Sequence, residues 1–247
     1  MAMIIGHRGA RNLWPENSLE GFRKLAELGV EGVEFDVHMT SDGHLAVIHD
    51  PTLERTTAGI GPVGARTLAE LQMTTLRDST ESIPSLDQVL EVLGGSSLEL
   101  HIELKTDMMG TAYTGMEAKV LEAVRRHGLE KRSILTCFML EVLETIRVLD
   151  STIPVLASID RRSSEMLGGL DRAIDRLKVI PGIYVAVEKT LLIHTLQQFS
   201  GVFGAERIGA WVPNDEADLR HWLDQPIRQI TTDRPDIALR ARAGISG

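Results

Sequence analysis

The sequence is poor in cysteine, in aromatic residues and in basic charge. Its 247 residues include one cysteine, Cys137, so no disulfide can form within the chain, and we expect a cytoplasmic protein. Aromatic residues make up 4% of the chain, too few for the stacking platforms that bind single-stranded nucleic acid. The formal net charge of −9 also argues against binding to nucleic acid or to an anionic membrane, because both require a basic surface.

Long hydrophobic runs are missing as well. No run approaches the roughly 18 apolar residues of a membrane span, and the N-terminal sequence MAMIIGHRGA lacks the apolar core of a signal peptide. We therefore expect no stable membrane anchoring. The chain is 43% hydrophobic and 25% charged, which is typical of a globular protein with a sizeable core. Composition leaves the oligomeric state open, a homo-oligomer included.

Apolar segments of strand length alternate with amphipathic helical patterns along the whole chain, which indicates a parallel sheet with crossover helices. Eight segments, about one per 31 residues, predict an α/β fold of the TIM (β/α)₈ barrel type, with residues 1–247 as one catalytic domain. An open doubly wound sheet is the alternative, but no glycine-rich dinucleotide loop follows the first strand. The predicted strands are Met3–Gly6, Val33–Val37, Leu98–Leu104, Ser133–Cys137, Pro154–Ser158, Gly182–Ala186, Arg207–Val212 and Ile227–Thr231.

Several polar residues predict where helices begin. The spacing of a capping box, in which a polar residue precedes Glu or Gln by three positions, occurs at three places, and a single polar residue precedes a further helical pattern over 215–223. The three pairs are Asn17 with Glu20, Ser85 with Gln88, and Thr114 with Glu117, and the single residue is Asn214.

One stretch is longer than a barrel unit requires. About sixty residues separate Val37 from Leu98, where a strand and its helix need about thirty. The turn Ser41-Asp42-Gly43 predicts a hairpin between Val37 and a further strand at Leu45–Ile48. Residues 51–84 are rich in Thr, Gly and Arg, so we predict a small inserted subdomain there. Since barrel active sites lie at the C-terminal ends of the strands, this subdomain should overhang the site.

Three carboxylates share the predicted interior of the barrel. Side chains alternate along a strand, so Glu34 and Asp36 point the same way, and the same alternation directs Glu103 inward together with Lys105. Buried carboxylates are costly unless they are paired or hold a cation. A structural ion-pair network is one interpretation. The other is a site for a hard divalent cation, and all-oxygen ligands favour Mg²⁺ or Ca²⁺ over Zn²⁺.

Two histidines follow strands at the end of the barrel where active sites lie. His7 comes directly after the first strand and His49 directly after the hairpin strand. Cleavage of a phosphate ester requires a base, a proton donor and positive charge for the phosphoryl oxygens. Two histidines, Arg8, Lys105 and a metal would supply all of these. For any single histidine, a hydrogen-bonded structural role is the alternative.

Other side chains near the strand ends allow further expectations. Trp211 and Phe138 end or follow strands, where they form either an apolar wall for the organic part of a substrate or part of the core. His38 and His101 share the inward-facing parity of the carboxylates, and we expect His101 to pack deep and His38 to line the mouth. Cys137 lacks a basic neighbour, so we assign it to packing.

A series of short motifs, in this order, resembles the glycerophosphodiester phosphodiesterase family over nearly the whole chain. The motifs are His7-Arg8-Gly9, Pro15-Glu16-Asn17-Ser18, Glu34-Phe35-Asp36-Val37, Asp42-Gly43, His49-Asp50, Arg55-Thr56-Thr57, Ile83-Pro84-Ser85-Leu86, Ile102-Glu103-Leu104-Lys105 and Thr232-Asp233-Arg234-Pro235.

The resemblance implies a TIM barrel with a subdomain inserted after the second strand. It further implies metal-dependent hydrolysis of a small-molecule glycerophosphodiester, such as glycerophosphocholine, to an alcohol and glycerol 3-phosphate. In this family pattern, Glu34, Asp36 and Glu103 bind the divalent metal.

The same resemblance assigns the remaining groups. His7 and His49 correspond to the general acid–base pair, and Arg8 and Lys105 to the contacts with the phosphate. Trp211 and Phe138 are candidates for binding the substrate because of their places at the strand ends, and not because of the resemblance.

Two alternative functions are compatible with the sequence. The first is a related barrel phosphodiesterase that acts on lysophospholipids or phosphoinositides, for which the apolar residues of the insertion would form either a lipid groove or merely a small core. These residues are Leu53, Ile60, Val63, Leu68, Leu71, Met73 and Leu76. The second is a non-catalytic phosphate-binding barrel, which would typically lack an acid–base or metal residue.

Overall fold

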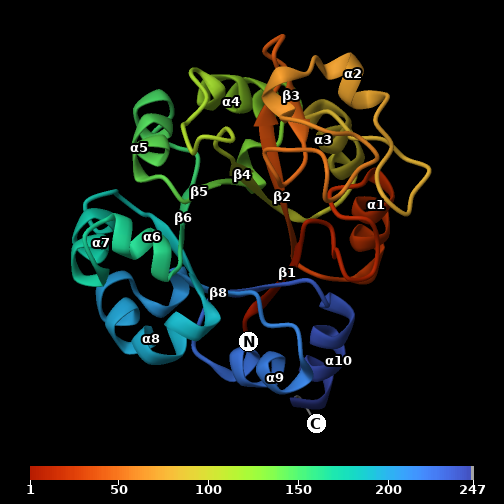
Figure 1. Cartoon of the computed structure of the whole chain (residues 1–247). Coiled ribbons are helices and arrows are strands. Elements are labelled where there is room, and N and C mark those ends of the chain that lie inside the picture. Colours follow the sequence, from red (N-terminus) through yellow and green to blue (C-terminus); the bar gives the residue numbers. More distant parts are fainter. Residues whose placement is uncertain (246–247) are drawn as a thin grey trace.

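Parallel strands close into a ring at the centre of the molecule, and helices surround them (Figure 1). The computed structural model describes residues 1–245. Within this range the ring contains the strands β1 (Met3–His7), β2 (Gly32–Met39), β4 (Glu99–Leu104), β5 (Ser133–Cys137), β6 (Val155–Ile159), β7 (Tyr184–Glu188), β8 (Ile208–Trp211) and β9 (Gln229–Thr232). Each strand is parallel to the next, and β9 pairs with β1 to close the ring.

This ring confirms the predicted TIM barrel. All eight predicted barrel strands are present, and their ends differ from the predicted ones by at most two residues. The helices are α1 (Leu19–Leu28), α2 (Leu68–Gln72), α3 (Leu86–Gly94), α4 (Met116–Arg126), α5 (Leu140–Leu149), α6 (Arg161–Met166), α7 (Leu170–Leu177), α8 (Lys189–Phe203), α9 (Glu216–Asp224) and α10 (Pro235–Ile245). Short 3₁₀ turns occur at Val63–Ala65, Glu130–Arg132 and Ala205–Arg207. Across residues 1–245, no helix combines the length and the apolar character that a membrane crossing requires.

The main core lies between the strands and the helices. Val33, Phe35 and Val37 of β2 are fully buried on the outward face of the strand. Phe22 of α1 meets Phe35 edge to face, with 5.5 Å between the ring centroids. The outward residues of β2 therefore hold α1 against the barrel, which leaves the alternate residues, Glu34 and Asp36, to face the interior.

Three of the four predicted helix starts are wrong. Helix α1 is capped by Ser18, whose hydroxyl accepts a hydrogen bond from the Gly21 amide, because the Asn17 side chain is bonded to Asp36 instead. Helix α4 begins after Gly115, which has a φ of 77°, and not at Thr114; no side chain caps it.

The predicted start of α9 is wrong for the same reason as that of α1, whereas the predicted start of α3 is confirmed. Helix α9 is capped by Asp215, while Asn214 binds Asp233. The capping box of Ser85 and Gln88 is present as predicted. For Asn17 and Asn214, a distant carboxylate therefore takes the side-chain amide that was predicted to cap the helix.

The predicted hairpin is present, and residues 51–84 fold beside it. Strand β3 (Leu45–Val47) pairs antiparallel with β2, and the inserted segment carries α2 and lies outside the ring (Figure 1). The apolar side chains of the hairpin and the insertion cluster with one another; the buried members are Ala46, Ile48, Leu53, Val63, Leu71, Leu76 and Ile83. Most of the apolar insertion residues therefore form a small core, and they do not line a lipid groove.

We expect Leu71→Ala to lower the free energy of unfolding by about 2–5 kcal/mol, because Leu71 is fully buried in this small core. Urea unfolding curves measure the change. Met73 is two positions further along the insertion and 86% exposed, so Met73→Ala should change stability by less than about 0.5 kcal/mol. Equal effects of the two substitutions would contradict this account of the insertion.

Candidate active site

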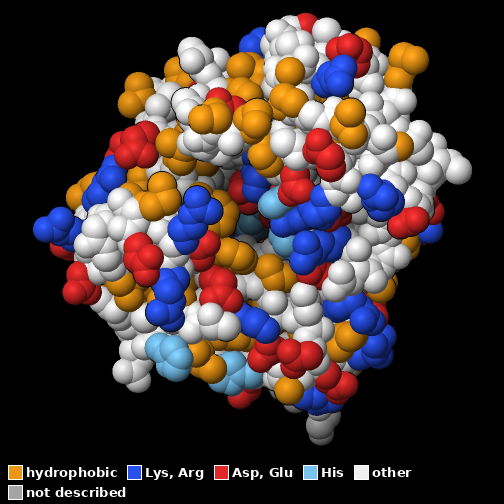
Figure 2. All heavy atoms as spheres, viewed as in Figure 1, with side chains coloured by type: hydrophobic (Ala, Val, Ile, Leu, Met, Phe, Trp, Pro, Cys, Tyr) orange, Lys and Arg blue, Asp and Glu red, His pale blue; other side chains and the backbone are white. Residues whose placement is uncertain are grey.

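A cavity of about 290 Å³ opens where the barrel strands end. The side chains proposed from the sequence as catalytic, substrate-binding or metal-binding line it, except Asp36, which is fully buried beside it. Figure 2 shows the hollow at the centre of this face, with histidine and basic side chains on one side and hydrophobic side chains on another. The fold therefore collects residues from both ends of the chain at one place.

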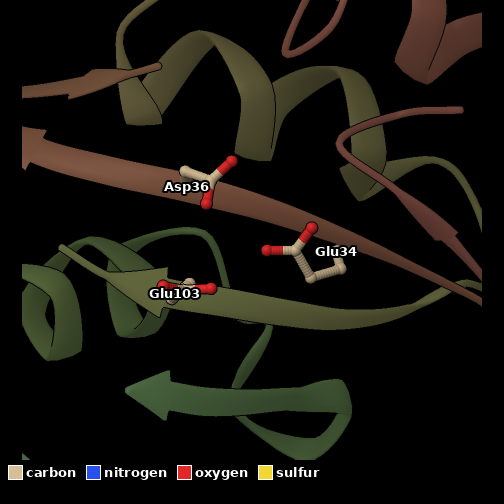
Figure 3. Close-up of side chains that lie close together, drawn as sticks. All are labelled: Glu34, Asp36 and Glu103. Carbon is tan, nitrogen blue, oxygen red and sulfur yellow. The ribbon is translucent and has the colours of Figure 1, made fainter. Parts of the chain in front are cut away.

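Three carboxylates from two neighbouring strands meet at this cavity (Figure 3). Asp36 of β2 is in register with Glu103 of β4, and Glu34 lies two residues earlier on the same face of β2. One oxygen of each carboxylate lies within 4.8 Å of the others. Glu34 Oε1 and Asp36 Oδ1 are buried, and neither accepts a hydrogen bond from the described residues. Orphaned carboxylate oxygens in such a cluster suit a hard divalent cation.

The pKa shifts of Glu34 and Asp36 also suit a cation at the cluster. Burial, together with the charges of Asp36 and Glu103, raises the pKa of Glu34 well above its ordinary value. Burial opposes the ionisation of Asp36 too, but the positive charges of Lys105, His49 and Arg8 hold the pKa of Asp36 well below its ordinary value. The positive groups of the protein therefore favour the ionised form of Asp36 but not that of Glu34, and a cation bound beside Glu34 would favour its ionised form.

Two basic side chains flank the cluster. Lys105 Nζ lies 2.8 Å from Glu103 Oε1 and 3.4 Å from Asp36 Oδ1, and these charges raise its pKa against the effect of burial. Arg8 Nε lies 3.5 Å from Asp36 Oδ2, and the Arg8 backbone N–H donates to Glu34 Oε2 at 3.1 Å. Both cations line the cavity, so they can also reach an anionic ligand within it.

His7 is held by a carboxylate from the opposite end of the sequence. Its Nδ1 lies 2.6 Å from Asp233 Oδ1, and its Nε2 lies 3.8 Å from Glu34 Oε2. Asp233 is fixed in turn by Asn214 and Arg11. Burial raises the pKa of Asp233, but the hydrogen bond from His7 and the charges around it lower that pKa to about 2. The carboxylate thus fixes one ring nitrogen and leaves Nε2 toward the carboxylate cluster.

His49 has the same kind of partner. Its Nδ1 lies 2.6 Å from Oδ1 of Asp50, the next residue in the chain, and the ring lines the cavity. Both candidate histidines therefore use Nδ1 to bind a carboxylate. In each ring, Nε2 is therefore the nitrogen that this carboxylate leaves available to a ligand.

The structure corrects the expectation for His38. This residue does not line the mouth of the cavity; it is fully buried, and its ring contacts the Tyr113 hydroxyl and the His49 carbonyl oxygen, both at 3.0 Å. Burial lowers the pKa of His38 to about 4. His38 therefore supports the backbone of His49. His101 packs deep in the lumen as expected, 2.7 Å from Glu99 Oε1.

An apolar wall faces the charged side of the cavity. Phe138 and Trp211 both line it and meet edge to face, with 5.7 Å between their ring centroids. The Trp211 indole donates to the Ala186 carbonyl at 3.2 Å, which orients the ring. Cys137 is buried behind this wall, and burial raises the pKa of its thiol to about 12, in keeping with a packing role.

Sequence reasoning missed the partners that orient the histidines. Asp233 lies 226 positions from His7, so no local spacing could connect the two residues. Asp50 follows His49 directly, and a carboxylate beside a histidine was a usable signal. The contacts of Arg55 with Asp50 and Glu16 were also missed.

Comparison with known proteins relates the chain to an enzyme family. Over residues 7–237 it matches the Glycerophosphoryl diester phosphodiesterase family. A glycerophosphodiester phosphodiesterase from Bacillus altitudinis is 32% identical over 251 aligned residues, which cover 98% of each chain. One from Caldanaerobacter subterraneus subsp. tengcongensis is 37% identical over 142 residues, or 55% of this chain; that match spans 58% of the relative's length.

Solved structures are similar over the whole fold. A crystal structure of a protein from Agrobacterium tumefaciens, which its name assigns provisionally to the same family, matches with a TM-score of 0.91 and 26% identity and covers 100% of this chain and 99% of its own. A glycerophosphodiester phosphodiesterase from the same organism matches with a TM-score of 0.78 and 26% identity, covering 97% and 100%.

We expect Mg²⁺ or Ca²⁺ to raise the Tm of the protein, because a cation that binds only the folded state stabilises it by mass action. Glu103→Gln should reduce this metal-induced shift, since it replaces one carboxylate of the cluster by a weaker neutral ligand. Thermal unfolding across a metal titration measures both effects. Glu91→Gln, an exposed position on α3, should leave the shift unchanged. An undiminished shift in Glu103→Gln would exclude Glu103 as a ligand.

Proposed function

The chain belongs to the glycerophosphoryl diester phosphodiesterase family, and from the geometry of its cavity we propose that it hydrolyses glycerophosphodiesters to an alcohol and glycerol 3-phosphate. One observation carries the proposal. Two histidines, each with Nδ1 held by a carboxylate, share a cavity with two cationic side chains, and a cluster of three carboxylates lies against it, two of them in its lining. Acid, base and positive charge are therefore available within one small volume.

The charged side of the cavity would bind the phosphodiester. Arg8 and Lys105 line it and are proposed to hold the phosphoryl oxygens. Glu34, Asp36 and Glu103 would hold a divalent metal, Mg²⁺ or Ca²⁺, which when bound supplies further positive charge to those oxygens. The orphaned oxygens of Glu34 and Asp36 support this assignment.

The histidines are proposed to move the protons. One imidazole takes a proton from the attacking hydroxyl as its oxygen bonds to phosphorus. The other imidazole gives a proton to the alcohol oxygen as that P–O bond breaks. The attacking group is either water or the 2-hydroxyl of the substrate's own glycerol, which would form a cyclic phosphate first. A diester that lacks this hydroxyl can be cleaved only by water. Its turnover therefore distinguishes the two routes.

We expect His7→Ala and His49→Ala each to lower kcat by about 10²–10⁴-fold, the usual contribution of a general acid or base. The assay follows glycerol 3-phosphate released from glycerophosphocholine. His194→Ala, at an exposed position on α8, serves as the control and should retain the wild-type rate. A wild-type rate in either active-site variant would remove that histidine from the mechanism.

A second substrate class has an observation in its favour. A cavity of about 320 Å³ adjoins the first one and shares Glu103, Lys105 and Phe138 with it. Its remaining walls include the apolar side chains of Leu104, Cys137, Met139 and Met166. Methionine adapts to apolar ligands of varied shape, so this cavity would accept an acyl chain of a lysophospholipid.

If this second class is used, Met166→Glu should raise the KM for a short-chain lysophosphatidylcholine and leave the KM for glycerophosphocholine unchanged. A charge would be placed against the acyl chain, which disfavours apolar binding. Met73→Glu places the same charge on the exposed insertion, outside both cavities, and is the matched control. No detectable cleavage of the lysolipid, with glycerophosphocholine cleaved normally, would exclude this class.

A further inference from the structure

One guanidinium group in the inserted segment binds two carboxylates at once. Arg55 Nε and Nη2 lie 2.5 Å and 2.9 Å from the two carboxylate oxygens of Asp50. Its Nη1 and Nη2 lie 2.8 Å from the two oxygens of Glu16. Arg55 does not line the cavity, and its side chain is 46% exposed. Any effect of Arg55 on the cavity therefore passes through Asp50 and Glu16.

Each of these carboxylates contacts a group of the cavity. Asp50 Oδ1 lies 2.6 Å from His49 Nδ1, and Glu16 Oε1 lies 3.3 Å from Arg8 Nη1. The chain of contacts thus runs from His49 through Asp50, Arg55 and Glu16 to Arg8. It joins a proposed acid–base group to a proposed phosphoryl contact of the same cavity.

His49 needs such support more than His7 does. The partner of His7, Asp233, is completely buried and lies directly after a barrel strand. His49 instead follows the hairpin arm, outside the barrel ring, and Asp50 is partly exposed. A single exposed ion pair holds its partners weakly, whereas bidentate contacts fix the orientation of both groups.

We propose that Arg55 is a positioning residue: it fixes Asp50 and Glu16, and through them the orientation of His49 and Arg8. The inference rests on the proposed function, because it assigns Arg55 a role in that reaction. It also gives the insertion a task. The small core of the insertion would fix the position of Arg55, and Arg55 would fix His49 and Arg8 relative to each other.

Arginine is suited to this task and lysine is not. The planar guanidinium presents its donors in a fixed fork that can pair with two carboxylates together, while an ammonium group is a single point. The backbone around Arg55 is itself held by Arg77, whose side chain donates to the Glu54 and Arg55 carbonyl oxygens. Arg77 is therefore not a neutral control. Arg66 is also in the insertion, and its side chain contacts the Ile60 carbonyl oxygen and Glu70 and, within residues 1–245, neither Asp50 nor Glu16, so it is the matched control.

The kinetic test uses glycerophosphocholine and the full chain. We expect Arg55→Ala and Arg55→Lys to lower kcat/KM by about 10–100-fold, as for other residues that orient a catalytic group. Arg66→Lys should stay within about twofold of wild type. Arg55→Ala should also cost less in an Asp50→Ala background than in the wild type, because the effect through Asp50 is then already lost. Unchanged kinetics in both Arg55 variants, or fully additive effects, would overturn the proposal.

A second measurement does not depend on turnover. With ¹⁵N-labelled histidine, the ring nitrogen shifts report the tautomer, and a carboxylate at Nδ1 holds neutral imidazole with its proton on Nδ1. We expect Arg55→Ala and Arg55→Lys to mix the tautomers of His49 and to leave His7 unchanged, since His7 depends on Asp233. An unchanged His49 spectrum overturns the inference, even if the wild type cleaves no diester, and loss of the His7 pattern would identify an unfolded variant. Wild-type inactivity with the expected spectra would reject the proposed function alone.

Discussion

The clustering of three carboxylates at one end of a barrel, two of them buried, is the constraint on which the site depends. Lys105 and Arg8 compensate part of the negative charge, and Asn17 and a backbone N–H bind two of the oxygens. To bring these donors close, the loop after β1 adopts left-handed backbone angles at the non-glycine residues Arg8, Ala10 and Asn17. Such angles are costly and tend to cluster at functional sites. The loop therefore adopts unfavourable backbone angles in the conformation that brings its hydrogen-bond donors to Glu34 and Asp36.

The two candidate histidines are fixed in different ways. The carboxylate that holds His7 belongs to the barrel itself and is buried with its own partners, Asn214 and Arg11. The carboxylate that holds His49 lies at the edge of the insertion within a partly exposed ion-pair chain. One candidate histidine is thus held by a buried group of the barrel, while the carboxylate that holds the other also binds Arg55 of the insertion.

The barrel interior is divided into two halves with different chemistry. Strands β1, β2 and β4 contribute charged side chains, whereas β5 to β8 contribute a small apolar cluster of Ile134, Leu156 and Ala186, with Trp211 packed against it. A phosphodiester has the same division, with a charged phosphoryl group beside an organic substituent. Among the described residues, no side chain of 51–84 lines the cavity: Arg55 reaches it only through Asp50 and Glu16, and most apolar residues of the insertion are used in its small core.

The sequence by itself determined the features that arise from short-range geometry. Alternation along a strand placed Glu34, Asp36 and Glu103 on one face, and turn residues marked the hairpin before His49. Tertiary structure alone decided which polar groups meet. Asn17 and Asn214 were expected to cap helices, yet they bind Asp36 and Asp233, because a side-chain amide forms its hydrogen bonds with whichever strong acceptor the fold brings near. Periodicity depends on neighbours in the chain, whereas the choice of partner depends on distance in space.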